Sequence, residues 1–152
     1  FAQLNFDIAD NGDFYVSFEA DSLMYRYDLD YNQLVCFGFA GRDMDLNYLR
    51  WDSYDQPWKE RLAERMSRGF YNAVEYVDET GLLFRSYRKG GGSVTDGLQV
   101  YRDGVLVGDV DVPLGFRMAG YVAPYYYSYV VPDEEGERLY MFRFKWPSAP
   151  EE

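Results

Sequence analysis

The sequence predicts an all-β protein built from repeated units of short antiparallel strands. Sixteen tyrosines, eleven phenylalanines and three tryptophans bring the aromatic content to 20% of 152 residues, and these residue types favour strands. The segment 4–41 contains four short runs with the two-residue alternation of strands. Turn residues separate the runs, and the first turn is the hairpin signal Asp10-Asn11-Gly12. Four antiparallel strands within about 40 residues match one blade of a β-propeller.

The same pattern returns twice further along the chain. Further strands are expected over 71–77, 82–87, 98–102 and 105–112, and then over 116–122, 125–131 and 138–145. The dipeptide Asp103-Gly104 predicts a tight hairpin. The stretch 88–96 contains three consecutive glycines and is expected to be a long flexible loop.

Two short motifs recur in the same order in the three units, which supports a true repeat. In the second strand the matching pairs are Ser17-Phe18, Ser86-Tyr87 and Ser128-Tyr129. In the third strand the matching triplets are Met24-Tyr25-Arg26, Val100-Tyr101-Arg102 and Met141-Phe142-Arg143.

One helix is expected, over 55–68, inside an insertion that separates the first two units. Asp55 suits the N-cap position, as does Ser53. Apolar residues recur every four positions, at Trp58, Leu62 and Met66. This stripe is expected to pack on the ends of the sheets as part of the core, with Glu60, Glu64 and Arg68 exposed.

The three units are interpreted as three propeller blades of one domain, at about 3–41, 71–113 and 116–146, with the helical insertion at 42–70. The third unit has three strands, so the last blade lacks its outer strand. Closed propellers carry about 4–8 blades, and three blades leave open edges and uncovered apolar faces. The chain is therefore expected to be half of a six-bladed β-propeller. A second copy of the chain, or a missing N-terminal half, would complete the ring.

Charge and composition narrow the function classes. The formal net charge of −11 disfavours nucleic acid and anionic membrane as partners. No run approaches the length of a membrane span, and Phe1 is expected to be a processed or trimmed start. Histidine is absent, which removes Ser-His and Cys-His nucleophile pairs and histidine metal sites. The single cysteine, Cys36, lies in an apolar strand and is expected to be buried.

Four segments resemble bacterial cell-envelope six-bladed β-propeller proteins of the NHL/TolB-like type. They are DNGDFYVSF, LMYRYD, LVCFGFAG and the late strand LYMFRF. The resemblance covers most of the chain as the C-terminal three blades, and the insertion departs from it. It implies a periplasmic or cell-surface location in a bacterium, because many proteins of this type are predicted lipoproteins. It also implies that a strand from the N-terminus of the chain forms the outer strand of the last blade. The matching motifs are general to the fold and contain no catalytic signature.

Asp43 and Asp45 are the candidate metal ligands. Their alternating oxygen ligands resemble the start of a calcium loop, but Tyr48 stands where such a loop has glycine. Calcium is therefore the one cofactor that the sequence leaves open.

Aromatic residues are the candidate ligand-binding groups. Tyr125 and Tyr127 belong to a strand with aromatic residues on both faces. Most of these aromatic residues are expected to pack between blades, and the others to face a binding groove. Trp51 and Trp58, on the insertion, are candidates for a wall of such a groove. Tyrosine and tryptophan bind glycans or peptides at low cost in side-chain entropy.

The function favoured by the sequence is a non-enzymatic ligand- or protein-binding propeller module of the bacterial cell envelope. The alternative is a propeller-fold carbohydrate-active enzyme, a hydrolase or lyase that uses paired carboxylates. The candidate carboxylates for that chemistry are Asp43, Asp45, Glu75 and Asp96.

Overall fold

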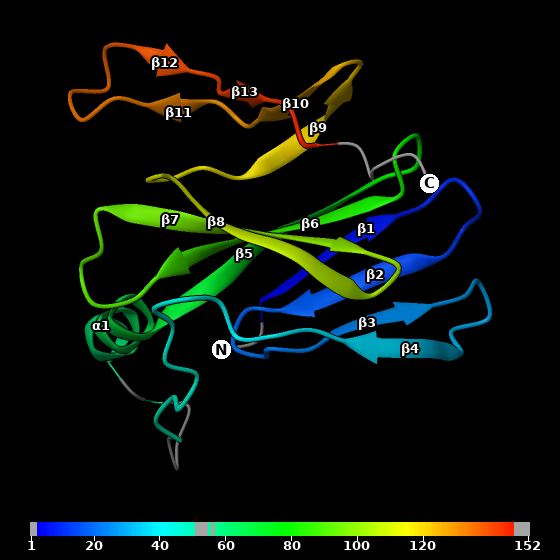
Figure 1. The fold of residues 1–152 in the computed structure, drawn as a ribbon. Helices are drawn as coiled ribbons and strands as arrows, with labels where there is room; N and C mark the ends of the chain where they lie inside the picture. The colour runs from blue at the N-terminus through cyan, green and yellow to red at the C-terminus, as the bar shows by residue number, and fades with distance from the viewer. Residues whose placement is uncertain (1–2, 51–54, 56, 148–152) are drawn as a thin grey trace.

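Three antiparallel sheets pack in layers in the computed structural model, which describes residues 3–50, 55 and 57–147 (Figure 1). The first sheet contains β1 (Leu4–Ile8), β2 (Phe14–Phe18), β3 (Met24–Tyr27) and β4 (Gln33–Phe37), in chain order. The second contains β5 (Gly69–Val77), β6 (Leu82–Lys89), β7 (Thr95–Arg102) and β8 (Val105–Pro113), also in chain order. The third joins β9 (Met118–Val122), β10 (Tyr125–Ser128) and β13 (Arg143–Phe144) in the order β13-β10-β9. The protein is thus mostly β, and the predicted four-stranded antiparallel sheets are confirmed.

The first strands of the three sheets lie next to one another, with β1 beside β5 and β5 beside β9. Hydrogen bonds join β1 to β5 directly. The Asn5 amide donates to the carbonyl oxygen of Tyr71 at 3.3 Å, and the N–H of Tyr76 donates to the Asp7 carboxylate at 2.7 Å. The three sheets therefore spread outward from a common line of first strands.

Of the two turns predicted in the second sheet, the structure has one as predicted and the other much shorter than predicted. Asp103 and Gly104 both have positive φ, 49° and 77°, as the predicted two-residue hairpin requires. The predicted long loop over 88–96 is wrong, because strand pairing continues to Lys89 on β6 and to Thr95 on β7. Only the short connection 90–94 lies outside the ladder.

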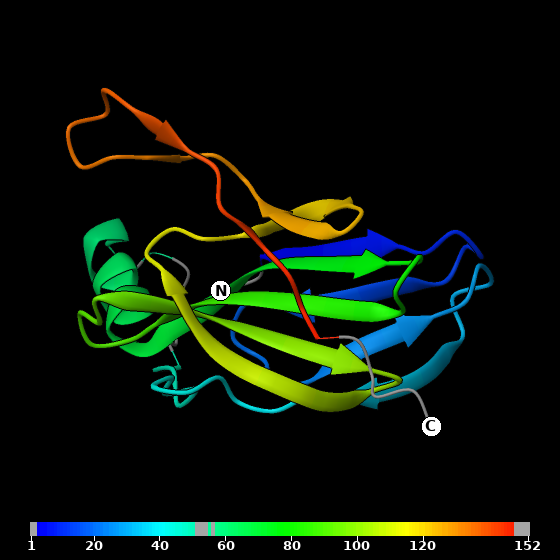
Figure 2. The same cartoon turned by 45° about the horizontal axis from the view of Figure 1, so that its top comes forward.

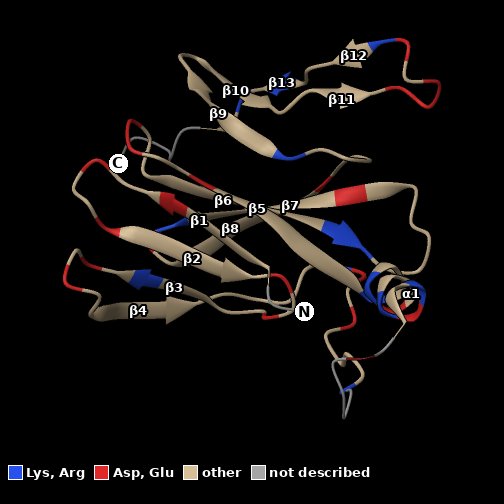
Figure 3. Ribbon diagram, turned by 180° about the vertical axis from the view of Figure 1, so that it is seen from behind, with Lys and Arg blue, Asp and Glu red and all other residues tan. Residues whose placement is uncertain are grey.

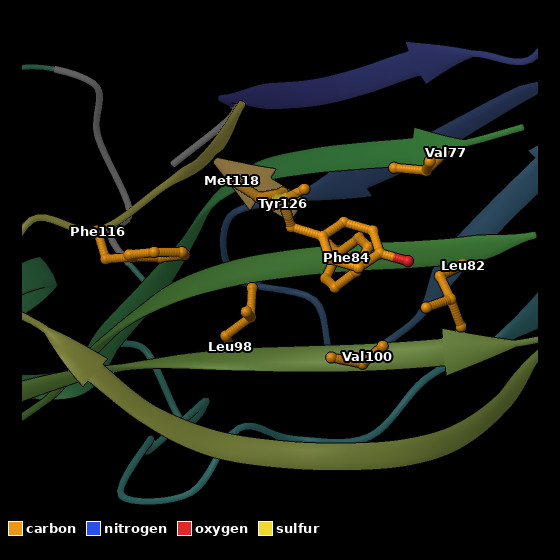
Figure 4. Close-up of a cluster of buried hydrophobic side chains, with 8 residues drawn as sticks. All are labelled: Val77, Leu82, Phe84, Leu98, Val100, Phe116, Met118 and Tyr126. Atoms are coloured by element: carbon orange, nitrogen blue, oxygen red, sulfur yellow. The ribbon is translucent and has the colours of Figure 1, made fainter. Parts of the chain in front are cut away.

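The second sheet is buried on both faces, which makes it the centre of the molecule. Against the third sheet it forms one apolar cluster (Figure 4), composed of Val77, Leu82, Phe84, Leu98, Val100, Phe116, Met118 and Tyr126. Against the first sheet it forms a second cluster, composed of Ala9, Tyr15, Met24, Val74, Leu83 and Tyr101. Continuous burial along β6 and β7 is the expected result for strands covered on two sides.

The repeat predicted from the serine motif has a clear physical basis. Ser17, Ser86 and Ser128 occupy the second strand of their respective sheets, and all three are buried. Each hydroxyl accepts a hydrogen bond from a neighbouring segment: from Arg85, from the N–H of Met118 and from the N–H of Phe142, at 2.8, 3.0 and 2.9 Å. In each unit the buried serine thus joins its strand to a neighbouring segment through a hydrogen bond.

Arg85 holds the first sheet against the second and is fully buried. Its guanidinium stacks over the ring of Tyr71, 3.2 Å from the centroid. It donates hydrogen bonds to the Ser17 hydroxyl and to the carbonyl oxygens of Ser22, at 2.7 Å, Leu23, at 3.3 Å, and Asp21. Burial lowers the pKa of Arg85 to about 10. A buried charge is tolerated here because its donors are satisfied by backbone acceptors.

The single helix among the described residues, α1 (Trp58–Arg68), packs by its polar side, so the predicted core stripe is wrong. Trp58 is 63% exposed and Leu62 38% exposed, and no residue of the helix is buried. Arg65 makes the main contact with the body of the protein. It pairs with the buried Glu19 at 2.9 Å and stacks over the ring of Phe70. The buried carboxylate attracts the cationic side of the helix, and the apolar stripe is left outside.

The ends of α1 also differ from the prediction. Pro57 occupies the N-cap position without a side-chain capping hydrogen bond, so the predicted cap at Asp55 is wrong, and Ser53 lies outside the described residues. Glu64 and Arg68 were expected to be exposed, but both are half-buried and form hydrogen bonds. Glu64 accepts hydrogen bonds from the N–H of Leu49, at 2.9 Å, and from Arg68, at 2.6 Å.

The outer face of the first sheet is apolar and uncovered. Leu4, Phe6, Ile8 and Phe18 are all large hydrophobic residues with exposed side chains, and Phe6 is 59% exposed. Charged residues gather at the turns and on α1, while the strands are largely uncharged (Figure 3). Cys36, on β4, is exposed, so the prediction that it is buried is wrong.

The third unit is less regular than the sequence suggested. The predicted strands 125–131 and 138–145 each break in two, and their distal halves form a separate hairpin of β11 (Val131–Pro132) and β12 (Leu139–Tyr140). This hairpin projects away from the sheets (Figure 2). At this break the Ser128 hydroxyl accepts the N–H of Phe142, and the Ser128 N–H donates to the carbonyl oxygen of Phe142, both at 2.9 Å. Within the described ranges, no helix has the length and apolar character needed to cross a membrane.

Candidate functional site

A cleft of about 610 Å3 opens between the second and third sheets. Its walls combine aromatic rings, two cations and two prolines, and they consist of Thr80, Leu82, Arg102, Tyr121, Pro124, Tyr126, Lys145, Trp146 and Pro147. A volume of this size is in the range of small-molecule sites in proteins, which are usually concave, largely apolar and furnished with a few polar groups.

Three parts of the fold build the cleft. The second sheet contributes the β5–β6 turn and the end of β7, and the third sheet contributes the β9–β10 hairpin. The chain after β13 then crosses the second sheet and closes one side (Figure 2). Gly108 on β8 permits this crossing, because a Cβ atom there would lie 2.3 Å from the ring of Trp146.

The aromatic wall is rigid because it is part of the core. The rings of Tyr121 and Tyr126 lie with centroids 4.7 Å apart at an angle of 41°. Tyr126 also stacks on Phe144 at 5.4 Å and packs on Phe84 at 4.8 Å. Burial raises the pKa of the Tyr126 hydroxyl above its usual value, with Thr80 and Arg102 acting in the opposite direction. The Tyr126 side chain therefore stays neutral at physiological pH.

Two cationic residues line the cleft, and they come from different parts of the fold. Arg102, at the end of β7, is half-buried, and Lys145, after β13, is exposed. Among the described residues neither forms an ion pair. By contrast, at the other end of the second sheet Arg42 and Lys89 both bind the carboxylate of Asp111, each at 2.7 Å.

A second place of interest lies on the line of first strands, where Asp7 of β1 and Glu75 of β5 come together. The pKa of Glu75 is raised to about 7, first by burial and then by the negative charge of Asp7. Asp7 itself is held by hydrogen bonds from the N–H groups of Tyr76 and Ile8. A glycine faces Glu75 from β9: a Cβ atom at Gly120 would lie 3.7 Å from its carboxylate. A half-buried carboxyl group with this pKa can hold or release a proton near neutral pH.

The predicted tyrosines lie close to the cleft but on a different face of their strand. Tyr125 and Tyr127 alternate with the buried Tyr126 along β10, so they point to the outer side of the third sheet. Arg143 and Lys145 both lie over the ring of Tyr125, at 4.6 and 5.1 Å from its centroid. Lys145 borders the cleft, but its ammonium lies on the same side as Tyr125.

The predicted tryptophans do not join these tyrosines in the described structure. Trp58 is on α1, where Arg61 lies 5.9 Å from its ring. The helix and β10 lie well apart in each view (Figures 1 to 3). Trp51 lies outside the described residues.

The candidate carboxylates have separate partners. Asp43 forms an ion pair with Lys89 at 3.3 Å, and Asp45 forms one with Arg68. Asp96 is buried and accepts the N–H of Gly115 at 2.7 Å. In the part of the chain that the structure describes, no group of three acidic or cysteine side chains is placed to hold a metal ion.

Sequence reasoning missed most of the cleft and one member of the carboxyl pair. Arg102 was noted only as part of a repeated triplet, and Trp146, at the end of the third predicted unit, was given no functional role. Asp7 carried one usable signal, since Asn5 and Asp7 form the polar side of a strand whose other side is apolar.

Comparison with known proteins gives one structural likeness. No family model and no curated protein matches the sequence. A crystal structure of a member of the DUF4221 family from Bacteroides vulgatus resembles this chain with a TM-score of 0.55 and 11% sequence identity. The match covers 74% of this chain and 34% of that one, so the chain corresponds to about a third of the longer protein. The likeness therefore shows that the β-rich arrangement of sheets occurs as part of a larger bacterial fold.

Proposed function

We propose that this chain is a three-blade portion of a β-propeller that acts as a non-enzymatic binding module, with a small ligand held in the cleft between the second and third sheets. The observation that carries the proposal is the cleft itself. It has the volume of a small-molecule site, a rigid aromatic wall and, at Arg102, a cation that has no carboxylate partner among the described residues.

The propeller assignment has two supports in the arrangement of the sheets. The first strands lie along a common line, and strand order within each four-stranded sheet leads away from that line, as in blades around an axis. The likeness to about a third of a longer chain is what a set of blades from a larger ring would give.

The proposed location is the periplasm or surface of a bacterium. Its supports are the resemblance to bacterial envelope propellers and the likeness to a protein from Bacteroides vulgatus.

The proposed partner is either a second copy of the chain or a missing N-terminal half, and it would cover the exposed face of the first sheet. That face displays Leu4, Phe6 and Ile8, and contiguous apolar surface of this kind marks interaction sites. Sedimentation across micromolar concentrations tests the proposal. Self-completion predicts a dimer that Phe6→Glu dissociates, whereas a missing half predicts aggregation or poor folding of this chain alone. A well-folded monomer by sedimentation and hydrogen exchange would contradict the three-blade interpretation.

Binding in the cleft is tested with a mixed panel of small sugars, amino acids and organic acids. Saturation-transfer NMR detects bound panel members, and Tyr126→Leu should remove the signal while Tyr140→Leu, on the exposed β12, should keep it. Circular dichroism checks that both variants fold. Failure of every panel member to bind the folded wild-type protein would refute the proposed function.

A second candidate function is a carbohydrate-active hydrolase or lyase, and it is favoured by the raised pKa of Glu75 beside Asp7. Glu75 would then act as the general acid, and its activity would decline as the pH rises through about 7. The test is turnover of aryl glycosides and polyuronates. Activity that disappears in Glu75→Gln supports this candidate, and activity unchanged by that substitution excludes it.

A further inference from the structure

We infer that the ligand of the inter-sheet cleft is a small anion whose single carboxylate is carried on a flat ring. The inference rests on the proposed function, because it names the chemical class that the cleft would bind. It follows from the position of Arg102 in the cleft and from the aromatic wall beside it.

The charges of the cleft define the anionic part of the ligand. Arg102 lines the cleft from the end of β7 and supplies the cation that a carboxylate in the cleft would meet, whereas the Lys145 ammonium lies over the ring of Tyr125. Arg102 is half-buried, and within the described ranges it makes no hydrogen bond that would occupy its guanidinium. A guanidinium binds a carboxylate through two parallel N–H donors, and a partly buried one loses less of this interaction to solvent.

The rings of the cleft define the flat part of the ligand. Tyr121, Tyr126 and Trp146 present their faces or edges to the same space, with Pro124 beside them. Sugar rings and aromatic rings both pack well on such walls, so both a sugar acid and an aromatic acid fit the shared chemistry. The Thr80 hydroxyl supplies a further hydrogen-bonding group on the wall of the cleft.

The surroundings select against larger anions. Glu79 lies close enough to influence the pKa of Tyr126, and the chain as a whole has a net charge of −11. A polyanion such as nucleic acid would meet this repulsion along its whole length, whereas a single carboxylate beside Arg102 meets much less of it. A volume of about 610 Å3 likewise suits a ligand of one or two rings.

The experiment compares acids with matched neutral compounds by isothermal titration calorimetry on the full chain. The probes are D-glucuronate with D-glucose, and benzoate with benzyl alcohol. At least one acid is expected to bind about tenfold or more tightly than its neutral partner, because a charge-assisted hydrogen bond adds about that much. Which acid binds distinguishes the two sources of the carboxylate.

Variants locate the binding. Arg102→Gln should weaken the acid about tenfold or more and leave the neutral compound unchanged, while Arg102→Lys should retain part of the affinity. The matched control is Arg138→Gln, an exposed cation next to β12 outside the cleft lining, and it should bind as wild type. Raising the salt concentration should weaken the acid specifically.

The outcomes separate this inference from the proposed function. Equal affinity for acid and neutral partner would overturn the ligand class and leave a ligand-binding cleft in place. Acid binding that Arg102→Gln does not change would place the site elsewhere and overturn the inference. Binding of neutral panel members without either acid would also overturn it. If neither the mixed panel nor the four probes bind to the folded protein, both proposals are refuted.

Discussion

Replacement of the buried Arg85 should separate the first sheet from the second without disturbing the second sheet itself. The variant Arg85→Met keeps most of the side-chain volume and removes the donors. Four acceptors then lose their partner: the Ser17 hydroxyl and the carbonyl oxygens of Asp21, Ser22 and Leu23. At about 1.5 kcal/mol for each charge-assisted hydrogen bond, the gross loss is about 6 kcal/mol.

Part of this loss in the free energy of unfolding is offset, because the methionine variant no longer buries a charge. Burial lowers the pKa of Arg85 from 12.5 to about 10, which corresponds to a cost of about 3 kcal/mol in the wild-type protein. The net expectation is therefore a decrease of about 3 kcal/mol in the free energy of unfolding. For a chain of this length the melting temperature should fall by about 6–12 °C.

The assay is urea unfolding at one fixed protein concentration, followed by tryptophan fluorescence and circular dichroism. Arg88→Met is the matched control, since Arg88 lies three residues further along β6 and its described surroundings contain no ion pair or hydrogen bond to its side chain. The control should stay within about 0.5 kcal/mol of wild type. Hydrogen exchange adds a spatial readout, because protection should be lost on β2 and β3 before β6 and β7.

A change of less than about 1 kcal/mol in Arg85→Met would refute this reasoning. It would mean that water or the main chain replaces the lost donors at no net cost. If Arg85→Met fails to fold, Arg85→Lys provides the graded test. Lysine keeps the charge but cannot reach all four acceptors, so its loss should be smaller than that of methionine.

The remaining predictions concern a carboxyl group and the helix. Because burial raises the pKa of Glu75 from 4.5 to about 7, the folded state binds the proton more tightly than the unfolded chain, and stability falls as the pH rises through this window. Because Glu75 is only half-buried, solvent screening reduces the free energy that corresponds to this pKa shift. Glu75→Gln should therefore stabilise the protein by about 1–2 kcal/mol at pH 8 and by almost nothing at pH 4. Equal effects at both pH values in urea titrations would contradict this prediction. Trp58→Ala should change the free energy of unfolding by less than about 0.5 kcal/mol because Trp58 is exposed, whereas Arg65→Ala should cost about 2–3 kcal/mol by leaving the buried Glu19 unpaired. A larger loss for Trp58→Ala than for Arg65→Ala in thermal melts would reverse the assignment of the packed face of α1.

The division into repeated units was accessible from the sequence because it depends on local chemistry. Alternation along a strand and turn residues such as Asp103-Gly104 act over a few residues, and they predicted most strands to within two or three positions. The serine repeat was also visible, since each unit uses the same buried hydroxyl at the same place in its second strand.

Which side of α1 packs against the protein could be learned only from the tertiary structure. Periodicity predicted that Trp58 and Leu62 would be buried, because in most helices the apolar stripe faces the core. Here the neighbouring surface presents the carboxylate of Glu19, which comes from a segment 46 positions away from Arg65. An ion pair between distant segments leaves no trace in local periodicity.

The sequence by itself determined the strand-rich character of the chain and the acidic, histidine-free composition that limits the chemistry. The tertiary structure decided which faces the sheets share, and with them the two places of functional interest. Glu75 has its raised pKa because the packed sheets bury it and β1 places Asp7 beside it, and the cleft near Arg102 is closed by Trp146 because the chain after β13 crosses the second sheet over Gly108. Both are contacts between residues far apart in the chain, and the free energies that select such contacts depend on burial and charge in the folded state.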